Sequence, residues 1–150
     1  MIVKADEQHL GVVKEITQKT ISEIYPHYYP EGAVNFFKNH HNDNHILSDI
    51  QKGIVYLLES NGDFVGTVTI RENEICRLFV LPEYQHKGYG KELIEYAEYK
   101  ISKNYREIIL DASMSAKKMY KYRGYIETEY HQIITENQDV LCYDVMKKEC

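Results

Sequence analysis

The segment Gln85–Gly90, QHKGYG, places two glycines one residue apart between an apolar run and a helical pattern. Glycine loses more conformational entropy on folding than other residues, so this pair indicates a sharp turn or a close backbone contact. A helix N-terminus presents free N–H groups and a partial positive charge, which favour a phosphate group. The segment has neither the GKS or GKT ending of a P-loop nor the GxGxxG of a dinucleotide-binding fold. A plain turn with a helix cap remains the alternative.

Hydrophobic periodicity and turn residues predict the elements around this segment. Helices are expected at residues 6–25, 32–39, 44–52, 88–103 and 115–123. Strands are expected at residues 2–5, 54–60, 64–71, 74–81, 107–111, 125–135 and 139–147. This order predicts an α/β domain of the α+β type, with a mixed and mostly antiparallel sheet.

Composition is typical of a soluble globular protein, with 43% hydrophobic and 27% charged residues, and one domain over residues 1–150 is expected. The net charge of −5 argues against bulk attraction to nucleic acid. No apolar run approaches the roughly 20 residues that span a bilayer, and the first residues lack a signal-peptide core. The three cysteines show no CxxC spacing. We therefore expect a reduced, cytoplasmic protein without disulfides or a metal site.

Two longer stretches carry a family resemblance. The run EICRLFVLPEYQHKGYGKELIEYAE resembles the acetyl-CoA-binding motif of the GNAT superfamily of N-acetyltransferases, in which a strand ends in Val-x-Pro before Gln-x-x-Gly-x-Gly. Downstream, LDASMSAKKMYKYRGY resembles the second GNAT signature, N-x-x-A-x-x-L-Y-x-x-x-G-F, with Ser113, Met119 and Tyr125 replacing the family Asn, Leu and Phe. The resemblance implies a GNAT-like sheet of about seven strands flanked by about four helices, and acetyl-CoA as acetyl donor.

The resemblance also implies a set of cofactor-binding residues. The backbone N–H groups of residues 86–91 would hold the CoA pyrophosphate, and a strand splayed from its neighbour at residues 78–80 would bind the pantetheine arm and polarise the thioester. Ser113 would lie near that arm, although a helix cap explains it equally. The implied cofactor-binding residues are Leu78, Phe79, Val80, Gln85, His86, Lys87, Gly88, Tyr89, Gly90, Lys91 and Ser113.

Two residues are candidates for proton transfer. Tyr120 occupies the tyrosine of the second signature, where a phenol with a pKa near ~10 can protonate a leaving thiolate of pKa near ~8.5. A core tyrosine with a satisfied hydroxyl is the alternative. Glu74, eleven residues before Gln85, matches a position where several family members place a general base. A solvent-facing glutamate, with a water chain as the base, is the alternative.

The aromatic stretch IYPHYYPEGAVNFFKNHHNDNH is expected to form the acceptor pocket, since aromatic rings hold cationic amines. The candidates are Tyr25, His27, Tyr28, Tyr29, Phe36, Phe37 and His40, with Tyr25, Tyr28, Tyr29 and Phe37 foremost. The histidines lack an accompanying ligand set, so no metal is expected. The resulting hypothesis is an N-acetyltransferase that acts on a small-molecule amine by direct attack. No nucleic-acid or membrane partner is expected. A homodimer could form through the last strands. The alternatives are a protein N-terminal or lysine acetyltransferase and a non-catalytic acyl-CoA sensor.

Overall fold

Seven strands form a single sheet in the computed structural model, which describes residues 1–150. Their order across the sheet is β1-β2-β3-β4-β5-β7-β6. All neighbouring pairs are antiparallel except β4 and β5, which run parallel. The strands are β1 (Ile2–Lys4), β2 (Val55–Ser60), β3 (Asp63–Arg71), β4 (Glu74–Val80), β5 (Glu107–Ala112), β6 (Ile126–Ile134) and β7 (Val140–Glu149). The predicted α/β class with a mixed, mostly antiparallel sheet is therefore confirmed.

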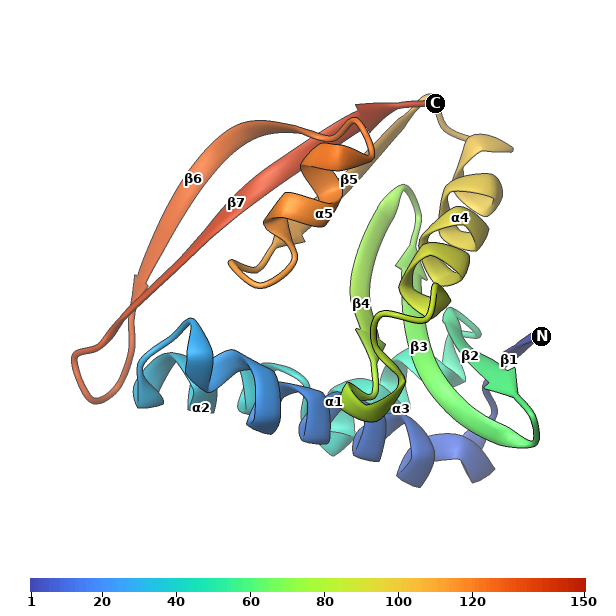
Figure 1. Cartoon of the computed structure of the whole chain (residues 1–150), viewed down its shortest axis with the longest axis horizontal. Coiled ribbons are helices and arrows are strands. Elements are labelled where there is room, and N and C mark those ends of the chain that lie inside the picture. Colours follow the sequence, from blue (N-terminus) through green and yellow to red (C-terminus); the bar gives the residue numbers. More distant parts are fainter.

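Five α-helices flank the sheet, at the five places where periodicity predicted them, whereas the GNAT resemblance implied about four (Figure 1). They are α1 (Leu10–Ile24), α2 (Glu31–His40), α3 (Asp43–Gln51), α4 (Tyr89–Ser102) and α5 (Lys117–Tyr122). Single 3-10 turns lie at Glu7–His9, Tyr25–His27 and Pro82–Tyr84. No helix combines the length and the apolar character that crossing a membrane requires.

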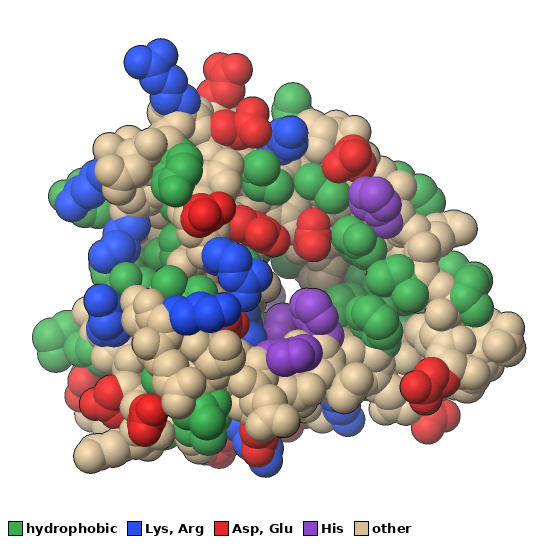
Figure 2. All heavy atoms as spheres, turned by 180° about the vertical axis from the view of Figure 1, so that it is seen from behind, with side chains coloured by type: hydrophobic (Ala, Val, Ile, Leu, Met, Phe, Trp, Pro, Cys, Tyr) green, Lys and Arg blue, Asp and Glu red, His purple; other side chains and the backbone are tan.

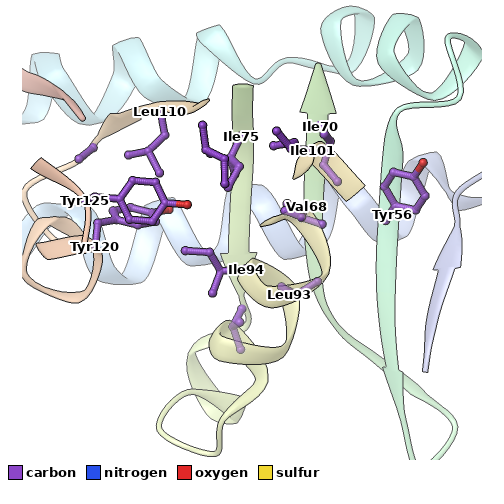
Figure 3. Packing of buried hydrophobic residues seen from close by; sticks show 14 of the residues in the cluster. Tyr56, Val68, Ile70, Ile75, Leu93, Ile94, Ile101, Leu110, Tyr120 and Tyr125 are labelled. Carbon is purple, nitrogen blue, oxygen red and sulfur yellow. The ribbon is translucent and has the colours of Figure 1, made fainter. Parts of the chain in front are cut away.

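Alternate residues of the strands pack into two cores, one on each face of the sheet. On β2, for example, Tyr56 belongs to the core beneath α4 and α5, whereas Leu57 belongs to the core beneath α1, α2 and α3. Figure 3 shows the first core, with labelled members that include Val68, Ile75, Leu93, Ile94, Ile101, Leu110 and Tyr120. Burial on both faces explains why the central strands are nearly continuous apolar runs.

The ladder between β4 and β5 is short. Only two residue pairs join the strands, Glu74 with Ile109 and Ile75 with Leu110. Beyond them β5 pairs only with β7, and Figure 1 shows β4 and β5 diverging. The β5-facing edge of β4 therefore has no partner strand from residue 76 to residue 80. The splay that the GNAT resemblance implied is present in the fold.

Strand β6 forms the far edge of the sheet, and nearly all of its residues are exposed. Its apolar side chains Ile126, Tyr130 and Ile134 lie among the exposed large hydrophobic residues. An unpaired strand edge can accept another strand. The homodimer expected through the last strands stays a prediction.

Candidate active site

The loop before α4 turns sharply at two residues. His86 and Gly88 have φ angles of 64° and 90°, a region where glycine carries no steric penalty. Gln85 anchors the loop, because its side-chain amide donates a hydrogen bond to the Val80 carbonyl at 3.0 Å. The backbone turn is thus the reason for glycine at position 88.

Six consecutive backbone N–H groups follow, from His86 to Lys91, and none donates to an acceptor in the chain. The Glu92 N–H is the first to bond within the helix, to the Gly88 carbonyl at 3.1 Å. No side chain caps α4. Free N–H groups at a helix N-terminus attract anions through both hydrogen bonding and the helix dipole. This run is therefore a ready-made anion site.

Gly90, unlike Gly88, is not explained by a turn of the backbone. It is the second residue of α4 and has no positive φ angle. An added Cβ would meet only Val80 Cγ2, at 3.9 Å, which is an ordinary contact. The packing of the protein therefore does not require glycine here. A bare backbone at this position leaves room for a ligand to approach the free N–H groups.

A groove, here called the α4 groove, runs along the start of α4 and the unpaired edge of β4. Its lining residues are Thr20, Ile24, Tyr25, Leu78, Phe79, Val80, Gln85, His86, Gly88, Gly90, Lys91, Ser113, Ser115, Ala116 and Met119. The predicted cofactor-binding residues all line it except Lys87 and Tyr89. The Lys87 ammonium lies 5.5 Å above the Tyr84 ring, and the Tyr89 hydroxyl bonds to Ser60 at 2.8 Å. The side chains of these two residues therefore contact other parts of the protein, while their backbone N–H groups stay without an acceptor in the chain.

A second cavity, here called the α2 cavity, lies between α2 and the β5, β7 and β6 part of the sheet. Its lining residues are Tyr25, Phe36, Phe37, His40, His41, Arg71, Glu74, Ile75, Cys76, Leu78, Phe79, Asp111, Ser113, Ala116, Tyr120, Ile133, Leu141 and Tyr143. The residues that it shares with the α4 groove are Tyr25, Leu78, Phe79, Ser113 and Ala116. The two spaces therefore meet at the gap between β4 and β5, where ligands bound in each can touch.

Tyr120 reaches the α2 cavity from α5 and is only 6% exposed. Its ring packs edge-on against Tyr125, with 5.5 Å between the centroids (Figure 3). Burial, and to a lesser degree Tyr25, raises the pKa of the Tyr120 phenol, so it stays protonated at neutral pH. Its hydroxyl forms no hydrogen bond in the chain, and it is not among the fully buried polar atoms that lack a partner, so the oxygen is accessible from the cavity. A protonated, free hydroxyl in a cavity has the properties of a general acid.

Glu74 lines the same cavity from the start of β4. Partial burial raises its pKa, nearby Asp111 raises it further, and Arg71 opposes the shift. Partial burial also raises the pKa of Asp111. Neither carboxylate forms an ion pair in the structure. A carboxylate with a raised pKa is a stronger base, so the position and environment of Glu74 are compatible with proton acceptance.

The aromatic residues divide into two groups. Tyr25 and Phe37 line the α2 cavity, edge-on at 4.8 Å between ring centroids, and Phe36 lies beside them. Tyr28 and Tyr29 do not line it, and their assignment to the acceptor pocket is corrected. Tyr28 is 47% exposed at the end of a 3-10 turn. Tyr29 is buried, and its hydroxyl is already engaged with backbone groups of two other segments.

Sequence reasoning missed the wall that β5, β6 and β7 supply. Its residues are Asp111, Ile133, Leu141 and Tyr143. They meet α2 only because β7 inserts between β5 and β6 in the sheet, and no local pattern marks this. Asp111 alone carries a signal, as an acidic residue that ends the otherwise apolar run Ile108–Leu110.

A buried ionic network supports the cavity next to α3. Arg77 donates to Asp49 Oδ2 at 3.2 Å, to Thr69 Oγ1 at 2.8 Å and to His41 Nδ1 at 3.2 Å. Arg71 donates to the other oxygen of Asp49 at 3.1 Å. Burial and the charge of Arg77 lower the pKa of His41 to about 2, so its ring is neutral. Because Nδ1 accepts, the ring proton lies on Nε2.

Comparison with known structures supports the fold. A GCN5-related N-acetyltransferase of Rhodopseudomonas palustris superposes with a TM-score of 0.91 at 18% identity, over 100% of this chain and 95% of that one. PaiA N-acetyltransferase of Thermoplasma acidophilum, solved with coenzyme A, has a TM-score of 0.75 at 21% identity, and the match covers 100% of this chain and 98% of that one. YncA of Salmonella typhimurium, solved with acetyl-CoA, has a TM-score of 0.75 at 13% identity, and the match covers 99% of this chain and 92% of that one. At these identities the likeness establishes the fold alone.

Sequence comparison establishes the family. No curated protein sequence matches the chain. The family model of the acetyltransferase (GNAT) domain matches residues 24–140, well over half of the chain. This match includes the glycine loop, the start of α4 and Tyr120. The chain therefore belongs to the GNAT family of acetyltransferases.

Proposed function

We propose that this protein transfers the acetyl group of acetyl-CoA to a primary amine of a small molecule, by direct attack and without a covalent enzyme intermediate. The observation that carries the proposal is the meeting of the α4 groove and the α2 cavity at the gap between β4 and β5. The groove would take acetyl-CoA and the cavity would take the amine. CoA and acetyl-CoA in two similar structures support this use of the groove.

The residues of the α4 groove fit acetyl-CoA, which supplies an activated acetyl thioester. The free N–H groups from His86 to Lys91 would hold the pyrophosphate, and the open position at Gly90 would let it approach. Lys91 also lines the groove and adds positive charge, partly balanced by Glu95 at 3.8 Å. The unpaired edge of β4 would offer backbone groups to the pantetheine arm and to the thioester oxygen.

Two side chains would move the protons of the reaction. The amine nitrogen forms a bond to the thioester carbon, the carbon–sulfur bond breaks, and the products are an acetamide and the CoA thiol. Glu74 would accept the proton that the amine loses, directly or through a water. Tyr120 would donate a proton to the leaving sulfur. Its raised pKa keeps the phenol protonated at neutral pH but also makes it a weaker acid than free tyrosine, so the proton would move only as charge develops on the sulfur.

A tight contact between the start of α2 and the turn that joins β6 to β7 supports a small acceptor. The Gly32 N–H, in the first turn of α2, donates to the Asp139 carboxylate at 2.8 Å, next to the start of β7. A Cβ at Gly32 would lie 1.9 Å from Asn137 Oδ1, so the backbone of α2 packs directly on the turn between β6 and β7. An extended peptide would need these segments to separate. A small amine would not.

The test compares two matched tyrosine variants. Tyr120→Phe is expected to lower kcat by about 10²–10⁴ and to leave acetyl-CoA affinity unchanged. Tyr125→Phe changes the neighbouring ring, whose hydroxyl contacts Glu98 instead, and should retain activity. Acetyl-CoA binding without turnover of any amine or peptide by the wild type would favour the non-catalytic sensor. Faster turnover of peptides than of small amines would favour a protein acetyltransferase.

A further inference from the structure

Three carboxylates lie on the face of the sheet that the α2 cavity occupies. Glu74 pairs with Ile109 on β5, and Asp111, two residues further on, points to the same face. Asp111 pairs with Val145 on β7, and Val145 pairs with Glu129 on β6. From ordinary strand spacing, the Cα atoms of Glu74 and Asp111 are about 8 Å apart, and those of Asp111 and Glu129 about 10 Å apart. The three residues form a row from the strand gap to the outer edge of the sheet.

This acidic row is poorly compensated within the protein. Glu74 and Asp111 have no ion-pair partner, and the only one of Glu129 is His131, at 3.9 Å and charged only when protonated. Arg71 also lines the α2 cavity, but it donates to Asp49. Glu74 is half-buried, whereas Asp111 and Glu129 are exposed, and Glu129 lies beyond the lining of the cavity. A cationic ligand would supply the missing partner.

Two further features of this cavity suit it to binding a ligand. Tyr120 is only 6% exposed, and its hydroxyl, which forms no hydrogen bond in the chain, is accessible from the cavity. The aromatic rings of Phe36, Phe37 and Tyr143 line the same space, and such rings attract cations. Figure 2 shows an opening on this side of the molecule, with red acidic side chains above it, purple histidines below it and blue basic side chains beside it. The cavity therefore combines a hydrogen-bonding group near the strand gap with aromatic and negatively charged walls.

We propose that the acceptor is a diamine or polyamine, whose reacting amine lies near Tyr120 while a second ammonium group is held by Asp111 and Glu129. This inference rests on the proposed acetyl transfer and specifies its acceptor. The row of carboxylates runs outward from the strand gap, so a linear chain of amines fits its direction. The second charge would supply binding energy remote from the reacting nitrogen.

An acceptor with a negative group is the main competitor, because a basic hollow adjoins the α2 cavity. The hollow includes Lys52, Arg71 and Arg77 and shares His40 and His41 with the cavity. Both arginines already donate to the Asp49 carboxylate, and burial lowers the pKa of both histidines. Lys52 is then the cation left without an ion pair. The balance of free charge favours a cationic acceptor.

The experiment compares three acceptors of equal chain length: hexamethylenediamine, hexylamine and ε-aminocaproate. We expect kcat/KM for the diamine to exceed that for hexylamine by at least about tenfold, mainly through KM, with ε-aminocaproate the poorest. Asp111→Asn should bring the ratio of diamine to hexylamine close to one. Glu127→Gln removes one negative charge from β6 of the same sheet, where Glu127 pairs with Lys117 and Lys121 instead, and should leave the ratio unchanged.

Binding gives a second readout that does not depend on turnover. Hexamethylenediamine titrated into the CoA-saturated protein should bind more tightly than hexylamine, and Asp111→Asn should remove the difference. Equal kcat/KM for diamine and hexylamine, or a preference for ε-aminocaproate, would overturn the diamine inference and leave acetyl transfer standing. Failure of the wild type to bind acetyl-CoA and to acetylate any amine would overturn both.

Discussion

Arg77 Nε donates a hydrogen bond to His41 Nδ1 at 3.2 Å, which joins β4 to the residue that follows α2. Both side chains are nearly inaccessible, at 3% and 8% exposure. β4 carries Glu74 and the edge of the strand gap, whereas α2 carries Phe36 and Phe37. The hydrogen bond therefore holds two walls of the α2 cavity in a fixed relation.

The neutral state of His41 makes stability depend on pH. The folded protein keeps this ring neutral down to about pH 2, whereas an unfolded histidine takes up a proton near its ordinary pKa of 6.5. The stability associated with the neutral ring is thus complete above pH 6.5 and is lost as the pH falls toward 2. His41→Asn keeps an acceptor near the Nδ1 position but cannot titrate. When the pH is lowered from about 7 to 5, the unfolding free energy of both proteins should fall. The fall should be about 2 kcal/mol smaller for His41→Asn than for the wild type.

Urea titrations at several pH values measure this effect. His27→Asn, at an exposed histidine, is the control and should follow the wild-type profile. Parallel pH profiles for the wild type and His41→Asn would show that His41 is not held neutral.

Removal of the Arg77 charge should be costly. Arg77→Met leaves the buried Asp49 carboxylate with Arg71 alone, and we expect a loss of about 3–5 kcal/mol in unfolding free energy. Lys19→Met breaks an exposed pair with Glu83 and should cost less than about 1 kcal/mol. Denaturant unfolding at neutral pH compares the two variants. Equal small losses would mean that the buried network contributes little.

Tyr29 supports the α4 groove indirectly. Its hydroxyl accepts from the Met114 N–H at 2.7 Å and donates to the Cys142 carbonyl at 3.3 Å. Met114 lies between Ser113 and Ser115, which line the groove. Tyr29→Phe should lower stability by about 1–3 kcal/mol and raise the KM for acetyl-CoA, because the Met114 N–H loses its acceptor. Tyr28→Phe, at an exposed hydroxyl, should change neither quantity.

The acid limb of the pH–rate profile should report on Glu74. Its carboxylate accepts a proton only when ionised, and Asp111 is one cause of its raised pKa. Asp111→Asn removes that cause, so the acid limb of kcat/KM for hexylamine should move to lower pH. Glu74→Gln should lower kcat/KM and remove the limb. An unchanged limb in both variants would assign the base to a water chain.

Local spacing in the sequence was enough to predict some of this architecture. The glycine turn and α4 each depend on residues close together in the chain, and the structure has both, whereas the role of Tyr120 stays a prediction. The wall around Asp111 and Tyr143 depends on the crossing of β7 between β5 and β6, which local patterns do not contain. The aromatic stretch was ambiguous for a similar reason, because a one-residue difference sends Tyr28 to solvent and Tyr29 into the core.

The most direct test is the affinity for acetyl-CoA, measured by calorimetry on the wild type, Gly90→Glu and Gly11→Glu. Both glycines are the second residue of a helix, where an acidic side chain favours the helix dipole. Only Gly90 adjoins the free N–H groups, and the Cβ of a residue at position 11 would meet nothing within 4 Å. We expect wild type and Gly11→Glu to bind with micromolar affinity, and Gly90→Glu to bind at least about tenfold more weakly while remaining folded. Equal affinity of the two variants, or no binding by the wild type, would contradict the assignment of this loop to the CoA pyrophosphate.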